Sequence, residues 1–305
     1  MRRGWCLGLL LLVAALAAAQ DMPLSQIRID GEGWKPVADG LKEPRSLASD
    51  ASGNVYVADS GNDRILRIDA SGKVAVFADH IRGVTGIAIG PDGRVYACQP
   101  QLNRIVAVRP GGKLEVIAEG INVAYMAATR DGILYCLGSR KNNIVMYVFI
   151  VEANSKKIRP VALSDIITPG PVVLWPDQGT LVVGHYQGIW AYRVAADHDL
   201  ADGQPYYSPR LKSNSVMCRG LTLDSAGRLY ATTVAGVQVF DPTGRLSGVL
   251  LDPAKGTPGG IAFGGPERDT LYVAWEDKVY ARKIKAKGAP PGGQASALNN
   301  PCPAS

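Results

Sequence analysis

Several residue types that support enzyme chemistry are scarce in this 305-residue chain. It has three histidines, His80, His185 and His198, which stand at different points of the repeat described below. Their placement disfavours a metal centre built from three imidazoles. The chain has no CxxC pair, which argues against that type of zinc or redox site, and no GxSxG motif of the serine-hydrolase type. These absences leave most of the common catalytic centres without candidate residues.

A strongly basic stretch is also missing. The formal net charge is +6, from 33 Lys and Arg against 27 Asp and Glu. The densest basic run, residues 281–288, alternates charged with apolar residues, as on the solvated face of a strand. Because neither a basic stripe nor a nucleic-acid-binding motif is present, we expect no nucleic-acid partner.

Long apolar runs are absent except at the N-terminus. There, Arg2 and Arg3 precede an apolar stretch over residues 7–16, and three alanines follow it. This is the pattern of a secretory signal peptide, and the stretch is shorter than the roughly 20 residues of a membrane-spanning helix. We expect a signal peptide over residues 1–19, no membrane span after its cleavage, and a secreted or periplasmic protein.

Four cysteines follow the signal sequence: Cys98, Cys136, Cys218 and Cys302. Export permits disulfide bonds, but four cysteines allow three pairings and the sequence does not choose among them. Cys98 and Cys136 lie inside apolar strand runs, which favours buried free thiols.

What the chain has in abundance is a repeated hairpin. Each unit combines an apolar run, a Gly turn, a short strand around a bulky residue, a polar turn and a further strand. The equivalent residues recur every 39 to 48 positions: Tyr56, Tyr96, Tyr135, Val182, Tyr230 and Tyr272. An aspartate also recurs at the first turn, where it is expected to form an Asx turn: Asp50, Asp92, Asp177 and Asp224. A period of this length with several strands per unit is typical of a β-propeller.

The repeat predicts an all-β fold, a six-bladed β-propeller over residues 41–288. The sixth unit lacks an outer strand, and residues 34–38 within the N-terminal segment 20–40 resemble the missing one. We therefore expect this N-terminal strand to close the ring, which leaves no unpaired edge. Residues 289–305 are rich in Pro, Gly and Ser and are expected to be disordered.

Two phrases resemble known families. LKEPRSLASDASGNVYVADSGNDRILRID resembles an NHL repeat, and LTLDSAGRLYATTVAGVQVFDPTGRLSG with GIAFGGPERDTLYVAW is similar to the gluconolactonase and senescence-marker-protein (regucalcin-like) family. The resemblance implies a six-bladed propeller. In enzyme members it also implies a divalent metal, held on the axis by a Glu, two Asn and an Asp, that polarises a lactone carbonyl and its attacking water.

This chain departs from the ligand pattern that the resemblance implies. The Glu is shifted by one residue to Glu43, and Ala124 or Tyr125 stands at the first Asn position. Gly170 stands at the second Asn position and Arg219 at the Asp position. Glu43 is the one metal-ligand candidate, so a calcium or zinc cofactor is expected only if other residues rebuild the site.

The residue before each inner strand of a propeller lines one mouth of the central channel. Counting back from each hairpin turn places Arg45, Thr85, Ala124, Gly170 and Arg219 there, with a residue near Gly260 in the sixth unit. Two arginines with no carboxylate would make this mouth positive, and the guanidinium fork suits carboxylate or phosphate. Arg45, Arg219, Thr85 and Tyr125 are the ligand-binding candidates, the alternative for the arginines being structural bonds to carbonyls or to Glu43.

Two functions remain open. One is an exported hydrolase of lactones or related esters, supported by the resemblance alone. The other is a non-catalytic NHL-type binding module, a monomer that holds an anionic small molecule or a protein at the channel mouth. For the second, residues 151–163 and 195–215, the latter with Tyr206 and Tyr207, are expected to form loops that enlarge one face. Glu267, Glu276 and Asp277 are interpreted as solvated loop charges.

Overall fold

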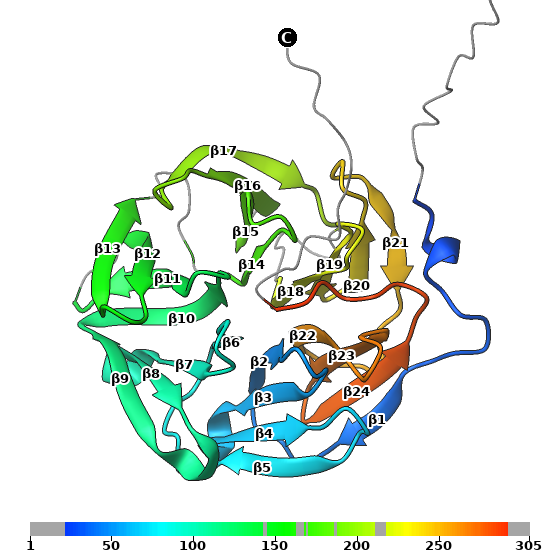
Figure 1. Ribbon diagram of the computed structural model, residues 1–305. Helices are drawn as coiled ribbons and strands as arrows, with labels where there is room; N and C mark the ends of the chain where they lie inside the picture. The colour runs from blue at the N-terminus through cyan, green and yellow to red at the C-terminus, as the bar shows by residue number, and fades with distance from the viewer. Residues whose placement is uncertain are drawn as a thin grey trace, which may run out of the picture.

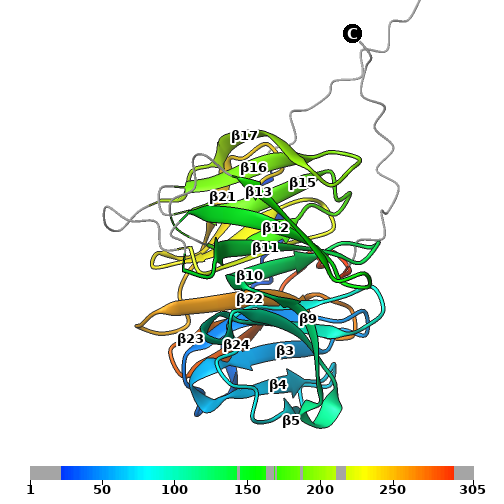
Figure 2. The same cartoon turned by 90° about the vertical axis from the view of Figure 1, so that its left-hand side faces the viewer.

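The chain forms a closed ring of β-sheets in a computed structural model that describes residues 22–142, 145–162, 168, 170–185, 188–210 and 218–291. Within these residues, six four-stranded antiparallel sheets surround a central axis (Figures 1 and 2). The expected six-bladed propeller is thereby confirmed. The expected signal peptide, Cys302 and most of the expected disordered tail lie outside the described residues. No helix in the described part of the chain is long and apolar enough to cross a membrane.

In blades one to five the innermost strand comes first in the chain, and in blade six only the outer strand β1 (Lys35–Ala38) precedes it. Blade one contains β2 (Pro44–Ser49), β3 (Val55–Asp59), β4 (Arg64–Ile68) and β5 (Val74–Ala78). Blade two contains β6 (Ile87–Ile89), β7 (Val95–Gln99), β8 (Arg104–Val108) and β9 (Leu114–Glu119). Blade three contains β10 (Ile121–Ala128), β11 (Ile133–Arg140), β12 (Met146–Glu152) and β13 (Lys157–Ala162).

Blade four contains β14 (Val172–Leu174), β15 (Thr180–His185), β16 (Gly188–Val194) and β17 (Leu200–Tyr207). Blade five contains β18 (Gly220–Leu223), β19 (Leu229–Thr233), β20 (Gly236–Phe240) and β21 (Leu246–Leu250). Blade six contains β22 (Pro258–Gly264), β23 (Thr270–Trp275), β24 (Lys278–Lys283) and β1 (Lys35–Ala38). Short 3-10 turns connect some elements: η1 (Leu24–Gln26), η2 (Ser60–Asn62), η3 (Pro100–Leu102) and η4 (Pro110–Gly112).

Strand β1 closes the ring as the outer strand of blade six. It pairs antiparallel with β24, with Lys35 opposite Ala281 and Ala38 opposite Val279. The preceding Trp34 donates its indole N–H to the carbonyl of Leu251 at 2.7 Å. The predicted closing strand over residues 34–38 is therefore confirmed, and it begins one residue later than expected.

The recurrent aspartates form the expected Asx turns at the first hairpin of their blades. In each, Oδ1 accepts the backbone N–H two residues later at 2.9 to 3.0 Å. The four pairs are Asp50 with Ser52, Asp92 with Arg94, Asp177 with Gly179, and Asp224 with Ala226. The sequence repeat thus has a local cause, because each aspartate holds the turn that starts the second strand.

The described parts of the two segments interpreted as enlarged loops contain outer strands instead. Residues 151–162 supply the end of β12 and all of β13, and residues 195–210 contain β17, while residues 163 and 211–215 lie outside the described residues. Tyr207 is buried, and the Tyr206 hydroxyl donates to the Pro242 carbonyl at 2.9 Å, so these tyrosines pack blade four on blade five. Outer strands of a propeller are half-exposed, which makes their sequences polar enough to resemble loops.

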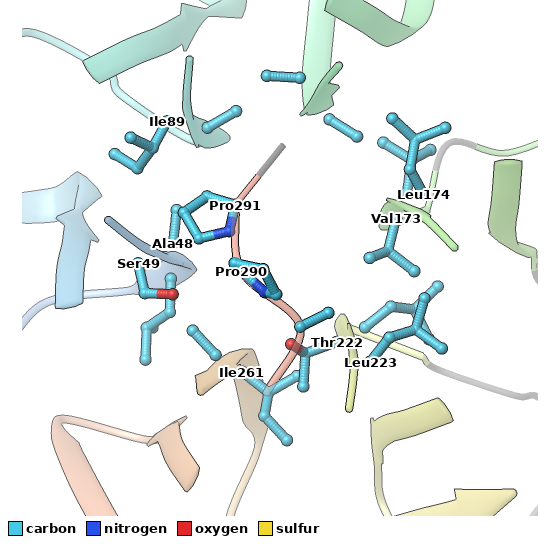
Figure 3. Close-up of a pocket in the computed structure, with 18 of the residues that line it drawn as sticks. Ala48, Ser49, Ile89, Val173, Leu174, Thr222, Leu223, Ile261, Pro290 and Pro291 are labelled. Carbon is cyan, nitrogen blue, oxygen red and sulfur yellow. The ribbon is translucent and has the colours of Figure 1, made fainter. Parts of the chain in front are cut away.

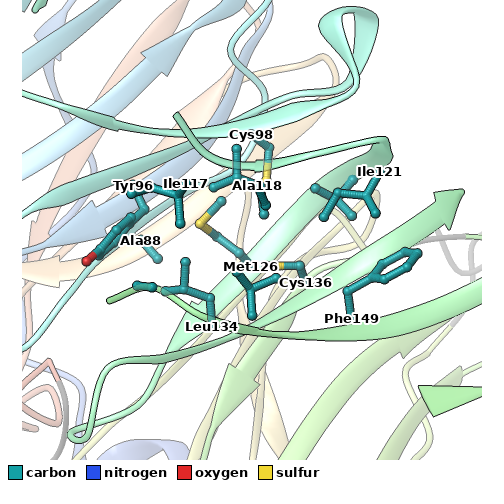
Figure 4. Packing of buried hydrophobic residues seen from close by; sticks show 14 of the residues in the cluster. Ala88, Tyr96, Cys98, Ile117, Ala118, Ile121, Met126, Leu134, Cys136 and Phe149 are labelled. Carbon is teal, nitrogen blue, oxygen red and sulfur yellow. The ribbon is translucent and has the colours of Figure 1, made fainter. Parts of the chain in front are cut away.

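The hydrophobic core lies between neighbouring blades. Six clusters of buried side chains occupy the six interfaces, including the closing interface of blade six with blade one. Figure 4 shows the cluster between blades two and three, where Cys98 and Cys136 lie with Met126, Leu134 and Phe149. Each blade is therefore held by both of its neighbours rather than by a single central core.

The buried cysteines carry a testable prediction. Cys98, Cys136 and Cys218 are buried free thiols. Burial raises the pKa of Cys98 and Cys136 well above the usual range and that of Cys218 to about 12, so these groups are not thiolates at pH 8. In a Cys302→Ser chain starting at residue 20, we expect no reaction with Ellman's reagent at pH 8, and three equivalents after unfolding in guanidinium chloride. Rapid reaction of one thiol with the reagent in the folded protein would contradict this burial.

Candidate functional site

A cavity of about 310 Å³ lies where the inner strands of the propeller begin. We call it the upper cavity. Its wall comes from four inner-strand starts and from the segments beside them. The lining residues are Glu43, Pro44, Arg45, Thr85, Ala124, Tyr125, Arg219, Thr257, Pro258, Gly259 and Glu276. All five candidates of the sequence analysis, Glu43, Arg45, Thr85, Tyr125 and Arg219, are thus brought together.

Irregularities of the inner strands shape this wall. The register of β2 against β3 shifts between Pro44 and Ser46, so Arg45 is the additional residue of a bulge. The register of β10 against β11 shifts in the same way around Ala124. Bulges bend a strand and redirect its side chains, and they are common beside functional sites. Arg45 and Ala124 therefore line the mouth because the ladder is interrupted at these residues.

The two arginines of the upper cavity differ in their partners. Arg45 Nη2 lies 2.7 Å from Glu43 Oε2, in an ion pair whose side chains are 47% and 65% exposed. This pair is one of the structural bonds considered for Arg45. No ion pair within the described residues involves Arg219. Its backbone N–H donates to the Thr232 carbonyl at 3.1 Å, which fixes the residue at the start of β18.

Tyr125 lies between the two cations. Burial raises the pKa of its hydroxyl, while the positive charge of Arg219, a hydrogen bond with Arg219 and the charge of Arg45 oppose that rise. The hydroxyl is therefore neutral at physiological pH. It is held beside Arg219, where it can take part in binding a polar ligand.

Glu276 is the lining residue that the sequence analysis missed. It follows β23, and its Oε1 accepts the backbone N–H of Thr257. Glu276 and Glu43 both have left-handed backbones, with φ of 54° and 51°, a conformation that costs non-glycine residues about 1 kcal/mol or more. Glu276 directly follows the second strand of blade six, at the end of the blade where the inner strands begin. This position in the repeat was the signal that could have identified it as a lining residue.

The prediction of a mouth without carboxylates is therefore wrong, because Glu43 and Glu276 both line the cavity. The physical reason is the insertion in blade six, which hid the register of that unit. Residues 258–259 line the cavity there, whereas Gly260 lies deeper in the channel. Gly170 is not part of the wall. A Cβ on Gly170 would lie 2.1 Å from the Gly184 carbonyl oxygen, so its place in blade four is one of close backbone packing.

The histidines lie apart from this cavity. His80 follows β5, His185 ends β15, and His198 lies between β16 and β17, where its Nε2 is 3.1 Å from Asp131 Oδ2. Burial lowers the pKa of His185. The interpretation that the three histidines form no common centre agrees with these positions.

The lining residues do not fit a divalent cation. Calcium and zinc require several oxygen or nitrogen ligands that converge on one point. In the upper cavity one carboxylate is paired with Arg45, the other accepts a backbone N–H, and Arg219 cannot coordinate a cation. No cluster of three or more His, Cys, Asp or Glu with metal-binding geometry occurs within the described residues.

Comparison with known proteins gives two family matches. Residues 139–275 match the family described as SMP-30/Gluconolactonase/LRE-like region, and residues 41–68 match the NHL repeat. The sequence search of curated proteins found no significant match.

Solved structures share the fold at low sequence identity. A structural-genomics target provisionally named a gluconolactonase has a TM-score of 0.76 and 22% identity, covering 87% of this chain and 96% of its own. A gluconolactonase from Xanthomonas campestris has a TM-score of 0.74 and 18% identity, covering 84% and 91%. The calcium-binding protein regucalcin from Agrobacterium tumefaciens has a TM-score of 0.71 and 16% identity, covering 86% and 97%. The chain is a six-bladed β-propeller in which residues 139–275 match the SMP-30/Gluconolactonase/LRE-like region and residues 41–68 match the NHL repeat.

Proposed function

We propose that the upper cavity binds a small organic acid through Arg219, with Arg45 and Tyr125 assisting. The position of Arg219 carries this proposal. Its guanidinium belongs to the cavity wall and is in none of the ion pairs of the described residues, so it can pair with a ligand carboxylate. A guanidinium presents two parallel N–H donors that match the two oxygens of a carboxylate.

The other lining residues of the upper cavity restrict which ligands can bind there. Two arginines and two glutamates nearly cancel in charge, so a bare multivalent anion would meet repulsion from Glu43 and Glu276. A ligand that also carries hydroxyl groups would donate to these carboxylates. A volume of about 310 Å³ is at the lower end of the range for small-molecule sites. The ligand class that fits best is therefore a small polyhydroxy acid.

A second candidate function is hydrolysis of a lactone or related ester. The observation that favours it is the match of residues 139–275 to a family whose description names gluconolactonase. The lining residues argue against the metal-assisted route, because Arg219 and the paired Glu43 are poor surroundings for a divalent cation. We propose that the family's metal site is lost in this chain and that no metal cofactor is needed for ligand binding.

The proposal places the protein outside the cytoplasm. Its support is the N-terminal sequence, in which Arg2 and Arg3 precede an apolar run and three alanines. We infer a secreted or periplasmic monomer with a small molecule as its partner. A protein bound across the same mouth is the alternative partner, and recovery of a stable protein complex with the cavity still empty would favour it.

The binding proposal predicts that one arginine variant loses affinity for the ligand. With D-gluconate as the probe in isothermal titration calorimetry, Arg219→Ala is expected to weaken binding about 10- to 150-fold, the equivalent of about 1.5–3 kcal/mol for a charge-assisted hydrogen bond. Arg67→Ala removes the same charge from an exposed position of β4 and should leave the affinity unchanged. Equal affinities of wild type and Arg219→Ala would contradict the proposal, as would a wild-type protein that does not bind gluconate.

An activity assay on the same wild-type protein distinguishes binding from hydrolysis. Glucono-1,5-lactone is added before and after dialysis against a chelator, and again with calcium or zinc. Gluconate binding without turnover in any condition supports the binding function. Turnover that requires the added metal would overturn the proposed loss of the metal site.

A further inference from the structure

The opposite end of the central channel is covered by the chain's own C-terminal segment. Residues 284–291 follow blade six and cross the lower mouth (Figure 1). There they border a cavity of about 170 Å³, the lower cavity, which is lined by the ends of the inner strands. Figure 3 shows Pro290 and Pro291 in the middle of this cavity, facing Ala48, Ile89 and Val173 across it. We call residues 284–291 the C-terminal strap.

One arginine ties the strap to the ring. Arg268 Nη1 donates to the Asp50 carbonyl at 2.7 Å and Nη2 to Ser49 Oγ at 3.1 Å, both in blade one. The same Nη2 donates to the Ala289 carbonyl at 2.7 Å. The Gly288 backbone N–H in turn donates to the Arg268 carbonyl at 2.8 Å. Arg268 therefore joins blade six, blade one and the strap through a single guanidinium.

The strap also pairs with blade five. The Ala289 N–H donates to the Leu223 carbonyl at 3.1 Å, and the Ser225 N–H donates to the Lys287 carbonyl at 2.8 Å. Gly288 lies so close to the ring that a Cβ at this position would be 2.2 Å from the Phe263 Cβ. These contacts show that the strap packs closely against the ring. Pro290 and Pro291, which follow Ala289, have no backbone N–H to donate.

The prolines suit the place they occupy. The wall of the lower cavity combines aliphatic side chains, among them Ile89, Val173, Leu174 and Leu223, with exposed polar groups. The proline rings lie in the middle of this cavity, within reach of the aliphatic side chains. Consecutive prolines bring apolar rings and no N–H, and their extended conformation is already restricted before binding.

We propose that the lower cavity is a second binding site, specific for an extended peptide with consecutive prolines, and that the strap is its intramolecular ligand. The neck between the two cavities has a volume of about 50 Å³, room for a few waters but not for an organic acid. Ligands of the upper cavity therefore enter and leave through the upper mouth. This inference does not depend on the proposed function.

The test displaces the strap in the full chain and offers its sequence in trans. Gly288→Ala introduces the clash with Phe263, and Arg268→Ala removes the hydrogen bonds that hold Ala289. Gly33→Ala is the matched control, because Gly33 is exposed, has no positive φ and has nothing within 4 Å of an added Cβ. The probe is a fluorescein-labelled peptide with the sequence KGAPPG of residues 287–292, followed by fluorescence anisotropy. A second peptide, KGAAAG, tests the need for proline.

We expect Gly288→Ala to bind KGAPPG at least tenfold more tightly than wild type or Gly33→Ala, in which the strap occupies the site. Arg268→Ala releases the strap but also removes the hydrogen bond that the alanine carbonyl of the peptide would accept, so it should bind KGAPPG more weakly than Gly288→Ala does. KGAAAG should bind at least tenfold more weakly than KGAPPG. Acrylamide quenching of Trp175, which lines the lower cavity, should rise in both strap variants and fall when KGAPPG is added. Circular dichroism establishes that each variant is folded. A folded Gly288→Ala variant that does not bind KGAPPG, or that binds both peptides equally, would overturn the proposal.

Discussion

Asp224→Ala is expected to lose about 3–5 kcal/mol of the free energy of unfolding, the cost of removing one partner from a buried ion pair. Asp224 Oδ2 accepts from Arg228 Nη1 at 3.1 Å and from the Tyr230 hydroxyl at 3.0 Å. Its Oδ1 accepts the backbone N–H groups of Ala226 and Arg228, both at 2.9 Å. The Arg228 side chain is only 10% exposed, so alanine would leave a nearly buried guanidinium without its carboxylate.

Asp50 provides the matched control because it forms the same turn in blade one with a neutral partner. Its Oδ1 accepts from Ser52 and Asn54, and its Oδ2 accepts from the Asn54 amide at 2.7 Å. Within the described residues no cation donates a hydrogen bond to this carboxylate, and Asp50→Ala should cost about 2 kcal/mol, or about 0.5 kcal/mol for each of its four hydrogen bonds from Ser52, Asn54 and Tyr56. Urea unfolding followed by circular dichroism measures both variants. Equal losses in the two would show that the charge of Arg228 does not set the difference.

A chain that starts at residue 40 is expected to lack a stable monomeric fold. This deletion removes β1, so the outer edge of β24 loses its partner and exposes unpaired backbone groups. It also removes buried Ile27 and the packing of Trp34 and Val37 on blade six. Burial of Ile27 is worth about 1.5–3 kcal/mol, and the partly buried Trp34 and Val37 and the pairing of β1 with β24 add to it. The total loss therefore approaches the roughly 5 kcal/mol that is the lower limit of stability for many domains.

Size-exclusion chromatography and thermal unfolding test the ring closure. The control chain starts at Met22 and keeps every described residue. We expect the control to elute as a monomer with one cooperative transition, and the chain from residue 40 to elute as oligomers or aggregates. A monomer from residue 40 that melts within a few degrees of the control would mean that β1 is dispensable for closure.

The two cavities have different origins in the sequence. The upper cavity could be anticipated from the repeat, because Arg45, Thr85 and Arg219 occupy the same position in three units. Residues at the same position of a cyclic repeat converge on the axis. Glu276 could not be anticipated in this way. It enters the wall from the second strand of blade six, whose register the insertion before Thr270 hides.

The lower cavity depends on contacts that no local pattern shows. Arg268 and the Asp50 carbonyl are 218 residues apart, and they meet because blade six closes on blade one. Residues 289–291 have a composition typical of disordered chain, yet they lie in the channel mouth. The ring supplies acceptors and apolar walls that the segment by itself does not have.

The sequence by itself determined the six units, the Asx turns, the closing strand and the place of Arg45, Thr85, Ala124 and Arg219 at the upper mouth. These follow from alternation and spacing along the chain, which act within a unit or repeat between units. Only the tertiary structure decided that Glu276 joins the upper cavity and that the C-terminal strap borders the lower one. Those contacts form when the ring closes, because closure brings together residues from the two ends of the chain.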